Sequence, residues 1–312
     1  MNKVIVIAGP TATGKTALSV ALSKELGGEV VSADSVQIYK GLNIGSAKPT
    51  KEEMQGVPHH MMDILEPDDS FSVANFCARA KEVISEIQSR GKVPVVTGGT
   101  GLYISSLVDN VSFIQEETDK SVREKLAQEL ETFGKEAMHE RLTEIDPEAA
   151  ARLHPADEKR VIRALEVYEE TGKTITQHNL ETKAVPPRYR PVWIGLDYQN
   201  RAALYRRIDL RVENMLSNGL LDEIRALLAL GVSPKTTAMQ AIGYKEFFGY
   251  LSGACSLDEA AALCKQRSRN YAKRQLTWFR RNPDVHWLRM TGTEDFSEVL
   301  SAARQNIPFS AL

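Results

Sequence analysis

The sequence lacks the long apolar run that a membrane-spanning helix needs. None of its 312 residues fall in a stretch that approaches the ~18–20 consecutive apolar residues required to cross a bilayer, which excludes a membrane-spanning protein. A secretory signal peptide also needs a longer apolar stretch than the one after Lys3, followed by a small-residue cleavage site. Those first residues fit a buried strand better, so we expect a cytoplasmic protein with no membrane partner.

Cysteine is scarce as well. The three cysteines, Cys77, Cys255 and Cys264, form no CxxC motif. An odd and sparse count argues against a disulfide framework and against a structural zinc site. Adjacent histidines rarely point at one ion, so we assign His59-His60 a structural role rather than metal binding.

An excess of either charge is missing overall, with 39 Lys and Arg against 41 Asp and Glu. The near balance hides a gradient, because residues 1–112, 113–200 and 201–312 carry net charges of −2, −5 and +5. The basic excess is greatest over 265–281, which holds seven cations, no acid and interleaved aromatic residues. Such a stretch suits the phosphates of a nucleic acid or is a solvated helix face, and charge alone leaves both open.

Strand and helix patterns alternate over the first hundred residues. Continuous apolar and β-branched runs, typical of strands buried on both faces of a sheet, lie at 3–8, 29–33 and 92–97. Helical spacing of apolar residues separates them at 15–26 and 72–90. This alternation predicts an α/β fold with a parallel sheet flanked by helices.

The pattern changes after residue 112. Residues 113–190 show helical periodicity without a strand signal, and Pro186-Pro187 breaks the chain near their end. We therefore expect a mainly helical insertion domain within an α/β core formed by 1–112 and 191–312. The last part of that core is predicted to contain strands at 191–196 and 285–288 and long helices at 200–230 and 257–281.

A phosphate-binding motif follows the first predicted strand. Residues 9–16, GPTATGKT, match G-x-x-x-x-G-K-[ST] between a strand and a helix, which is the context that the motif requires. The glycines let backbone N–H groups turn inward around an anion, and the helix N-terminus adds further donors. The motif predicts a P-loop NTPase-like core in which Lys15 reaches the outer phosphate and the Thr16 hydroxyl holds Mg²⁺.

The sequence has no acid where phosphate-transferring P-loop enzymes usually place one to organise Mg²⁺. The strand predicted at 92–97 is followed by Gly98-Gly99 rather than ending in an aspartate. This absence counts against ATP hydrolysis, and a small-molecule P-loop kinase stays open as an alternative.

Three segments should meet at the carboxyl edge of the sheet, where ligands of open α/β sheets bind. They are the 9–16 loop, the segment 34–39 after the second strand and the segment 98–103 after the third. Asp34 could cap a turn, but beside a phosphate cradle it is also a candidate base or metal-shell acid. Gly98-Gly99 is a turn or permits close approach of the backbone to a ligand.

Seven ordered segments together resemble the tRNA dimethylallyltransferase family in its bacterial form. They are 9–16, 34–49, 59–64, 98–103, 157–166, 241–246 and 273–280. The resemblance runs from residue 3 to about 290 and implies transfer of a dimethylallyl group from its diphosphate to N6 of adenosine 37 in the tRNA anticodon loop. Eukaryotic members add a C-terminal zinc finger, for which this chain lacks the cysteines.

The resemblance also implies roles around the cradle, which would bind the donor's diphosphate rather than ATP. The implied diphosphate ligands are Gly9, Thr11, Ala12, Thr13, Gly14, Lys15 and Thr16, with Arg207 and Arg211. The two arginines lie four residues apart on one predicted helix face, which is a solvated stripe in the alternative interpretation. Thr11, Lys15, Thr16-bound Mg²⁺ and Arg207 or Arg211 would neutralise the leaving group. Asp34 would accept the proton of the adenine amine, and Thr100 would contact the target nucleotide near the reacting atoms, so the implied catalytic residues are Asp34, Thr100 and Lys15.

The implied acceptor is a single-stranded anticodon loop whose target base leaves its stack. The helical insertion would grip that loop, and we expect the protein to act as a monomer. The implied tRNA contacts are Asp34, Ser35, Val36, Gln37, Thr100, Arg123, Lys159, Arg160, Arg163, Gln240, Gly243, Tyr244, Lys273 and Arg274. Two further alternatives remain: an adenylate isopentenyltransferase, which would need neither the insertion nor the basic stretch, and a tRNA-binding module, which would leave the cradle unexplained.

Overall fold

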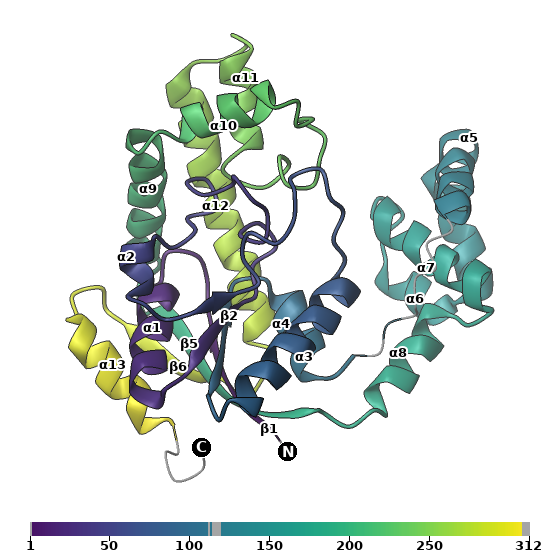
Figure 1. Ribbon diagram of the computed structural model, residues 1–312. Helices are drawn as coiled ribbons and strands as arrows, with labels where there is room; N and C mark the ends of the chain where they lie inside the picture. The colour runs from purple at the N-terminus through teal and green to yellow at the C-terminus, as the bar shows by residue number, and fades with distance from the viewer. Residues whose placement is uncertain (1, 112, 114–119, 308–312) are drawn as a thin grey trace. The chain divides into compact units, whose positions relative to one another are not determined.

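The chain divides into two units in the computed structural model, which describes residues 2–111, 113 and 120–307. The larger unit comprises Met1–Val108 and Arg188–Leu312, and the smaller comprises Asp109–Pro187 (Figure 1). The smaller unit therefore begins and ends a few residues earlier than the 113–190 predicted for the insertion.

A six-stranded sheet forms the centre of the larger unit, with the strand order β3-β2-β4-β1-β5-β6. Every pair of neighbouring strands is parallel, which confirms the predicted parallel sheet. The strands are β1 (Asn2–Ala8), β2 (Glu29–Ser32), β3 (His59–His60), β4 (Pro94–Gly98), β5 (Tyr189–Tyr198) and β6 (His286–Met290).

Helices lie on both sides of this sheet, with α1 and α13 on one side and α3 and α4 on the other (Figure 1). The helices of the larger unit are α1 (Lys15–Leu26), α2 (Lys51–Met54), α3 (Val73–Ser89), α4 (Gly101–Val108), α9 (Arg201–Ser217), α10 (Leu220–Ala229), the 3-10 turn η1 (Lys245–Phe247), α11 (Phe248–Leu251), α12 (Leu257–Phe279) and α13 (Phe296–Gln305). None of the described helices combines the length and the apolar character that crossing a bilayer requires.

The helix predicted over 200–230 is in fact two helices, α9 and α10. The chain turns between them at Gly219, whose φ of 93° is a left-handed conformation that glycine adopts without strain. The periodicity of the apolar residues continues across this break, which is why the pattern alone did not show it. The long helix predicted over 257–281 is confirmed as α12, which begins at a capping box between Ser256 and Glu259.

The sheet register brings three strand ends together. Ala8, the last residue of β1, pairs with Gly98 of β4 on one side and with Gly195 of β5 on the other. Ser32 at the end of β2 pairs with Thr97. The segments that leave β1, β2 and β4 therefore start from one edge of the sheet, as open parallel sheets place their ligand sites.

The smaller unit contains four helices and no strand among its described residues. They are α5 (Lys120–Ile145), α6 (Pro147–Arg152), α7 (Glu158–Thr171) and α8 (Ile175–Lys183). α5 is interrupted at Gly134, where the backbone leaves the helical conformation. The unit has a hydrophobic core of its own, in which Leu126 and Leu142 of α5 pack with Val161 and Leu165 of α7.

Candidate active site

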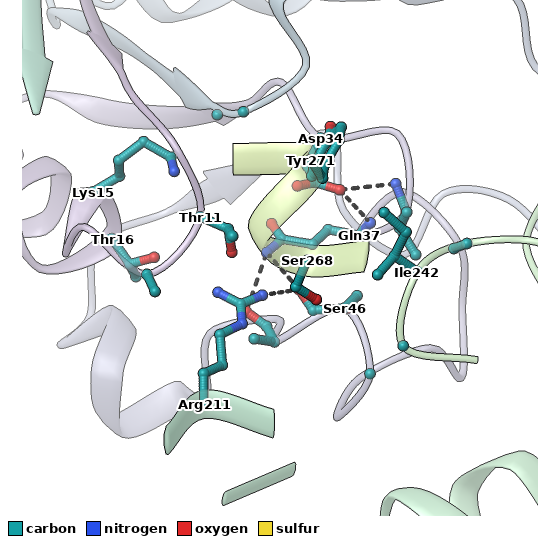
Figure 2. A pocket seen from close by; sticks show the side chains of 18 of the residues that line it. Thr11, Lys15, Thr16, Asp34, Gln37, Ser46, Arg211, Ile242, Ser268 and Tyr271 are labelled. Atoms are coloured by element: carbon teal, nitrogen blue, oxygen red, sulfur yellow. Dashed lines mark hydrogen bonds between the residues drawn. The ribbon is translucent and has the colours of Figure 1, made fainter. Parts of the chain in front are cut away.

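A cavity of about 460 Å³ lies at the carboxyl edge of the sheet. Its lining combines residues of the 9–16 loop, of the segment after β2, of the end of β4, and of α9 and α12. Figure 2 shows Lys15 and Thr16 on one side of this cavity and Asp34 and Gln37 on the other, with Arg211 reaching in from α9. The segments that the sequence placed at one sheet edge thus share one cavity.

The 9–16 loop is shaped by a close backbone approach. A Cβ atom at Gly9 would lie 2.6 Å from the carbonyl oxygen of Leu196 in β5, so no larger residue fits there without movement of the strand. Gly14 is left-handed at the start of α1, and Thr13, Gly14, Lys15 and Thr16 all line the cavity. Unpaired N–H groups at the N-terminus of α1 are therefore placed where an anion can bind.

Lys15 carries the main charge of the cradle. Its Nζ donates a hydrogen bond to the Pro10 carbonyl at 2.7 Å. Burial lowers the pKa of Lys15 to about 7, with a further contribution from the nearby Arg211 cation, while Asp34 opposes the shift. Two cations that disfavour each other in one buried site favour the binding of an anion between them.

Asp34 is held by the turn that follows β2. Its Oδ1 accepts hydrogen bonds from the backbone N–H groups of Val36 at 2.8 Å and Gln37 at 3.2 Å. The other oxygen, Oδ2, accepts no hydrogen bond from the described residues. The turn-capping interpretation of Asp34 is therefore confirmed, and this role leaves one carboxylate oxygen at the cavity for a ligand.

The segments after β2 and β4 are tied to each other and to the loop that precedes α2. The backbone N–H of Ser35 donates to the Thr100 hydroxyl at 3.2 Å. The Gln37 amide accepts from Ser32 and donates to the Ala47 carbonyl at 3.1 Å. Both ends of the Gln37 amide are thus engaged within the protein, and Ser35, Val36 and Gln37 all line the cavity.

The two arginines predicted on α9 occupy different places. Arg211 is half-buried, lines the cavity and donates to the Ser46 carbonyl at 3.3 Å. Arg207 is exposed and lines a neighbouring cavity of about 640 Å³, where its Nε donates to the Ala12 carbonyl at 3.1 Å. The solvated-stripe interpretation therefore does not describe Arg211, whereas Arg207 is exposed as that interpretation expects, although it also binds the cradle backbone.

Gln275 of α12 was missed by the sequence analysis. Only 5% of this residue is exposed. Its Oε1 accepts from the Thr11 N–H at 3.0 Å, and its Nε2 donates to the Gly99 carbonyl at 2.9 Å. One side chain therefore links the cradle, the segment after β4 and the basic helix. It is one of three amide residues in the cationic stretch 265–281, so neither a count of charges nor a local pattern singles it out.

Glu223 of α10 was also missed. Its two carboxylate oxygens accept hydrogen bonds from the backbone N–H groups of three successive residues, Asn43, Ile44 and Gly45, at 2.7–3.0 Å. The Tyr244 hydroxyl donates to Oε1 of the same carboxylate at 2.8 Å. This anchor holds the 43–47 loop, whose carbonyl groups bind Gln37 and Arg211.

The predicted RNA contacts at 240–244 divide into two kinds. Gln240 and Gly243 line the cavity, and Gln240 is exposed. Tyr244 is completely buried, so its side chain supports the 43–47 loop and does not face a ligand in this structure. Burial of the ring gives no support to the expected direct RNA contact by that side chain. The sequence alone does not distinguish a buried aromatic ring from an exposed one.

The basic stretch on α12 is less basic than its composition indicates. Four of its seven cations form ion pairs with acids of the larger unit, namely Lys265–Glu213, Arg267–Glu246, Arg269–Asp209 and Arg280–Asp197. Within the described residues, Lys273, Arg274 and Arg281 have no ion-pair partner, and Arg274 lines the cavity. Unpaired charge is therefore concentrated at three positions near the C-terminal end of the helix.

The smaller unit engages two of its four predicted RNA-binding cations internally. Arg123 and Arg163 both bind Glu166, which is 4% exposed, with distances of 2.8 Å. Burial alone would raise the pKa of Glu166, but the hydrogen bonds and charges of the two arginines outweigh it and lower the pKa. Lys159 and Arg160 are exposed, and Arg160 forms an ion pair with Asp157 on the surface.

The donor groups of the cavity suit a hydrated Mg²⁺ ion. No cluster of three or more His, Cys, Asp or Glu side chains among the described residues could hold a metal. Thr16 and Asp34 supply oxygens, while two buried polar atoms that line the same cavity, Thr97 Oγ1 and His59 Nε2, have no protein partner. Mg²⁺ keeps several waters and binds through few protein groups plus phosphate, so this set fits it. His59 thus lines the site, beyond the structural role predicted for it.

Comparison with known proteins finds similar sequences and structures over nearly the whole chain. The IPP transferase family model matches residues 37–282. The tRNA dimethylallyltransferase of Caldanaerobacter subterraneus subsp. tengcongensis is 48% identical over 306 residues, which cover 98% of this chain and 96% of the relative. That of Symbiobacterium thermophilum is 50% identical over 291 residues, covering 93% and 90%.

Two solved structures are similar over nearly the whole chain. The full-length tRNA isopentenylpyrophosphate transferase of Bacillus halodurans has 44% identity and a TM-score of 0.73, covering 98% of this chain and 95% of that one. A eukaryotic dimethylallyltransferase acting on tRNA has 32% identity and a TM-score of 0.83, covering 98% and 77%. Because the family model spans most of the chain and close relatives match it end to end, this chain belongs to the IPP transferase family.

Proposed function

We propose that this chain transfers a dimethylallyl group from dimethylallyl diphosphate to N6 of adenosine 37 in the anticodon loop of tRNA, and releases diphosphate. The observation that carries the proposal is the shared cavity, in which the phosphate cradle faces the Asp34 carboxylate. The proposed enzyme is a monomer, since one chain supplies both the donor and the acceptor side of the cavity. We propose that it acts in the cytoplasm.

The donor side stabilises a leaving anion. The bond between the allylic carbon and the diphosphate oxygen breaks, and negative charge accumulates on the diphosphate. N–H groups of the 9–16 loop, Lys15 and Arg211 lie where they stabilise that charge, as preorganised donors do in other group transfers. Mg²⁺, held by the Thr16 hydroxyl, supplies further neutralisation of the diphosphate when bound.

The acceptor side handles one proton. The N6 amine of adenine is a weak nucleophile because its lone pair is delocalised into the ring. As N6 forms its bond to the allylic carbon, one N6 proton passes to Oδ2 of Asp34, the oxygen that the turn leaves open. The fixed Oδ1 keeps the carboxylate in place during this transfer.

An extruded base must reach this carboxylate. A loop of single-stranded RNA loses little on extrusion of one base, whereas a duplex loses pairing and stacking. Gln240 and Arg274 line the cavity and are exposed, which supports a role for them in binding the flanking nucleotides. The 43–47 loop and the segment after β2 form the remaining wall.

The direct test is product analysis. The protein is incubated with dimethylallyl diphosphate, MgCl₂ and unmodified tRNA. Mass spectrometry of the nucleosides then identifies the modification, and mass spectrometry of ribonuclease fragments of the tRNA locates it. We expect N6-dimethylallyladenosine at position 37 only. Parallel reactions replace tRNA with AMP, or the donor with labelled ATP and a small-molecule acceptor. Transfer to AMP with none to tRNA, or phosphoryl transfer from ATP, would replace the proposed reaction with one of the alternatives.

A further inference from the structure

Trp278 on the last turn of α12 is a large aromatic residue left partly in solvent. It is 36% exposed, although its polar atom is already satisfied, since Nε1 donates to the Ser105 hydroxyl of α4 at 3.0 Å. The hydrogen bond fixes the orientation of the ring. A fixed, exposed indole offers a flat apolar surface whose ordering costs little further entropy on binding.

The ring is seated on the first residue of α4. A Cβ atom at Gly101 would lie 2.3 Å from Cδ1 of Trp278 and 2.6 Å from Cγ. The bare backbone at Gly101 therefore makes room for the indole, which lies against it. This packing explains one side of the ring and leaves the exposed part without a partner among the described residues.

Two unpaired cations flank Trp278 in the sequence. Arg274 lies four residues before it on the same face of α12, and Arg281 lies two residues beyond the end of the helix at Phe279. Neither arginine has an ion-pair partner in the described part of the chain, in contrast to the four paired cations of the same stretch. An apolar protein partner would not need this charge, whereas a phosphate chain would.

Arg274 and Trp278 lie at and beyond the rim of the active-site cavity. Arg274 lines the cavity that contains Asp34. Four residues of α-helix rise ~6 Å, so Trp278 lies about one nucleotide length beyond the cavity rim. A nucleotide joined to an extruded base would be long enough to reach the indole, with Arg274 at the cavity and Arg281 just past the helix end near its phosphates.

We propose that Trp278 is a stacking subsite for an unpaired nucleobase that directly flanks the target adenosine, with Arg274 and Arg281 binding the adjoining phosphates. The inference rests on the proposed function, because it takes RNA as the acceptor. It assigns a binding role to a residue outside the cavity lining. Base–aromatic stacking is tolerant of sequence, so this subsite contributes affinity for single-stranded RNA rather than discrimination among bases.

A double-mutant cycle tests the subsite. Binding is measured for wild type, Trp278→Phe and Trp278→Leu with an anticodon stem-loop that is intact or abasic on either side of the target base. We expect Trp278→Leu to weaken binding of the intact RNA on the order of tenfold, and Trp278→Phe much less, since phenylalanine retains a stacking face. Removing the base at one flanking position should weaken RNA binding by wild type but have little further effect on binding by Trp278→Leu. Additive losses at both positions would overturn the proposal.

Fluorescence separates stacking from packing of α4 against α12. Saturating RNA should quench the fluorescence of Trp278, which is obtained as the difference in emission between wild type and Trp278→Phe. Trp287→Phe, which removes a tryptophan in β6, is the matched control. Unchanged emission would overturn the subsite. Wild-type transfer to the intact stem-loop is measured in parallel. If Trp278→Leu binds the RNA and transfers the dimethylallyl group as well as wild type does, this inference alone is wrong. If wild type shows no transfer, the proposed function is wrong.

Discussion

The two sides of the active-site cavity are built in different ways. The donor side is one continuous octet, residues 9–16, whose anion-binding groups are mostly its own backbone. The acceptor side is assembled from segments far apart in sequence, such as Asp34 and the 43–47 loop, which Glu223 holds from α10. The anion-binding groups of the donor side are therefore encoded in one short stretch of sequence. The acceptor side also depends on residues, such as Glu223, that hold its segments without lining the cavity.

The strongest test of the donor side is Lys15→Met. The substitution keeps the apolar stem and removes the charge that faces the leaving diphosphate. We expect the rate of transfer to fall by about 10³-fold, in the upper part of the range for removing one stabilising group, with tRNA affinity unchanged. Single-turnover kinetics with saturating donor measures this. A rate within a few-fold of wild type would show that the cradle does not stabilise the leaving group.

A smaller effect is expected where the two sides meet, at Gln275. Gln275→Leu leaves the Thr11 N–H and the Gly99 carbonyl without their partner, so the cradle loses its tie to α12. We expect the affinity for inorganic diphosphate to fall by ~10-fold or more, which corresponds to one or two buried hydrogen bonds. Isothermal calorimetry measures it, with Thr277→Val on the exposed side of the same helix as the control. Equal affinities would show that the cradle is held without α12.

The unpaired and paired cations of α12 should behave differently toward RNA. Replacing Lys273 and Arg274 with alanine should weaken tRNA binding several-fold and reduce the slope of log affinity against log salt by about 1–2. Arg267→Ala should leave the slope unchanged, because that arginine is already paired with the buried Glu246. Similar slopes for both variants would mean that the internal ion pairs do not decide which cations reach RNA.

The smallest effect on function is expected at Glu29, at the start of β2 and thus at the end of that strand remote from the cavity. Burial raises its pKa, but hydrogen bonds from Lys92 and His60 and the charge of Arg90 outweigh this and hold the pKa below its usual 4.5. The ionised carboxylate therefore stabilises the fold above pH 4.5, and this contribution is lost as the pH falls through the lowered pKa.

Glu29→Gln should accordingly lower stability by about 1–2 kcal/mol at pH 7, a value discounted for the partly exposed cations. Its difference from wild type should shrink toward pH 3 in thermal melts. Transfer activity at 25 °C should be unaffected. A loss of transfer without a loss of stability would contradict the placement of Glu29 outside the site.

The parts that local sequence predicts are those with local causes. The octet at 9–16, the buried strands and α12 follow from patterns of neighbouring residues, and the structure confirms them. Glu223 and Gln275 bind backbone groups about 180 and 264 residues away along the chain, so no local pattern marks them. The ion pairs of four cations in the 265–281 stretch could not be predicted for the same reason, since their acidic partners come from other segments of the chain.

The central claim is that Asp34 accepts the proton of the attacking amine, and Asp34→Asn tests it most directly. Asparagine keeps an oxygen for the Val36 and Gln37 N–H groups but cannot take a proton. Single-turnover transfer, with tRNA and donor affinities measured on the same preparation, should show a rate lower by about 10²- to 10⁴-fold and both affinities within about twofold of wild type. Near-normal transfer by this variant would contradict the account.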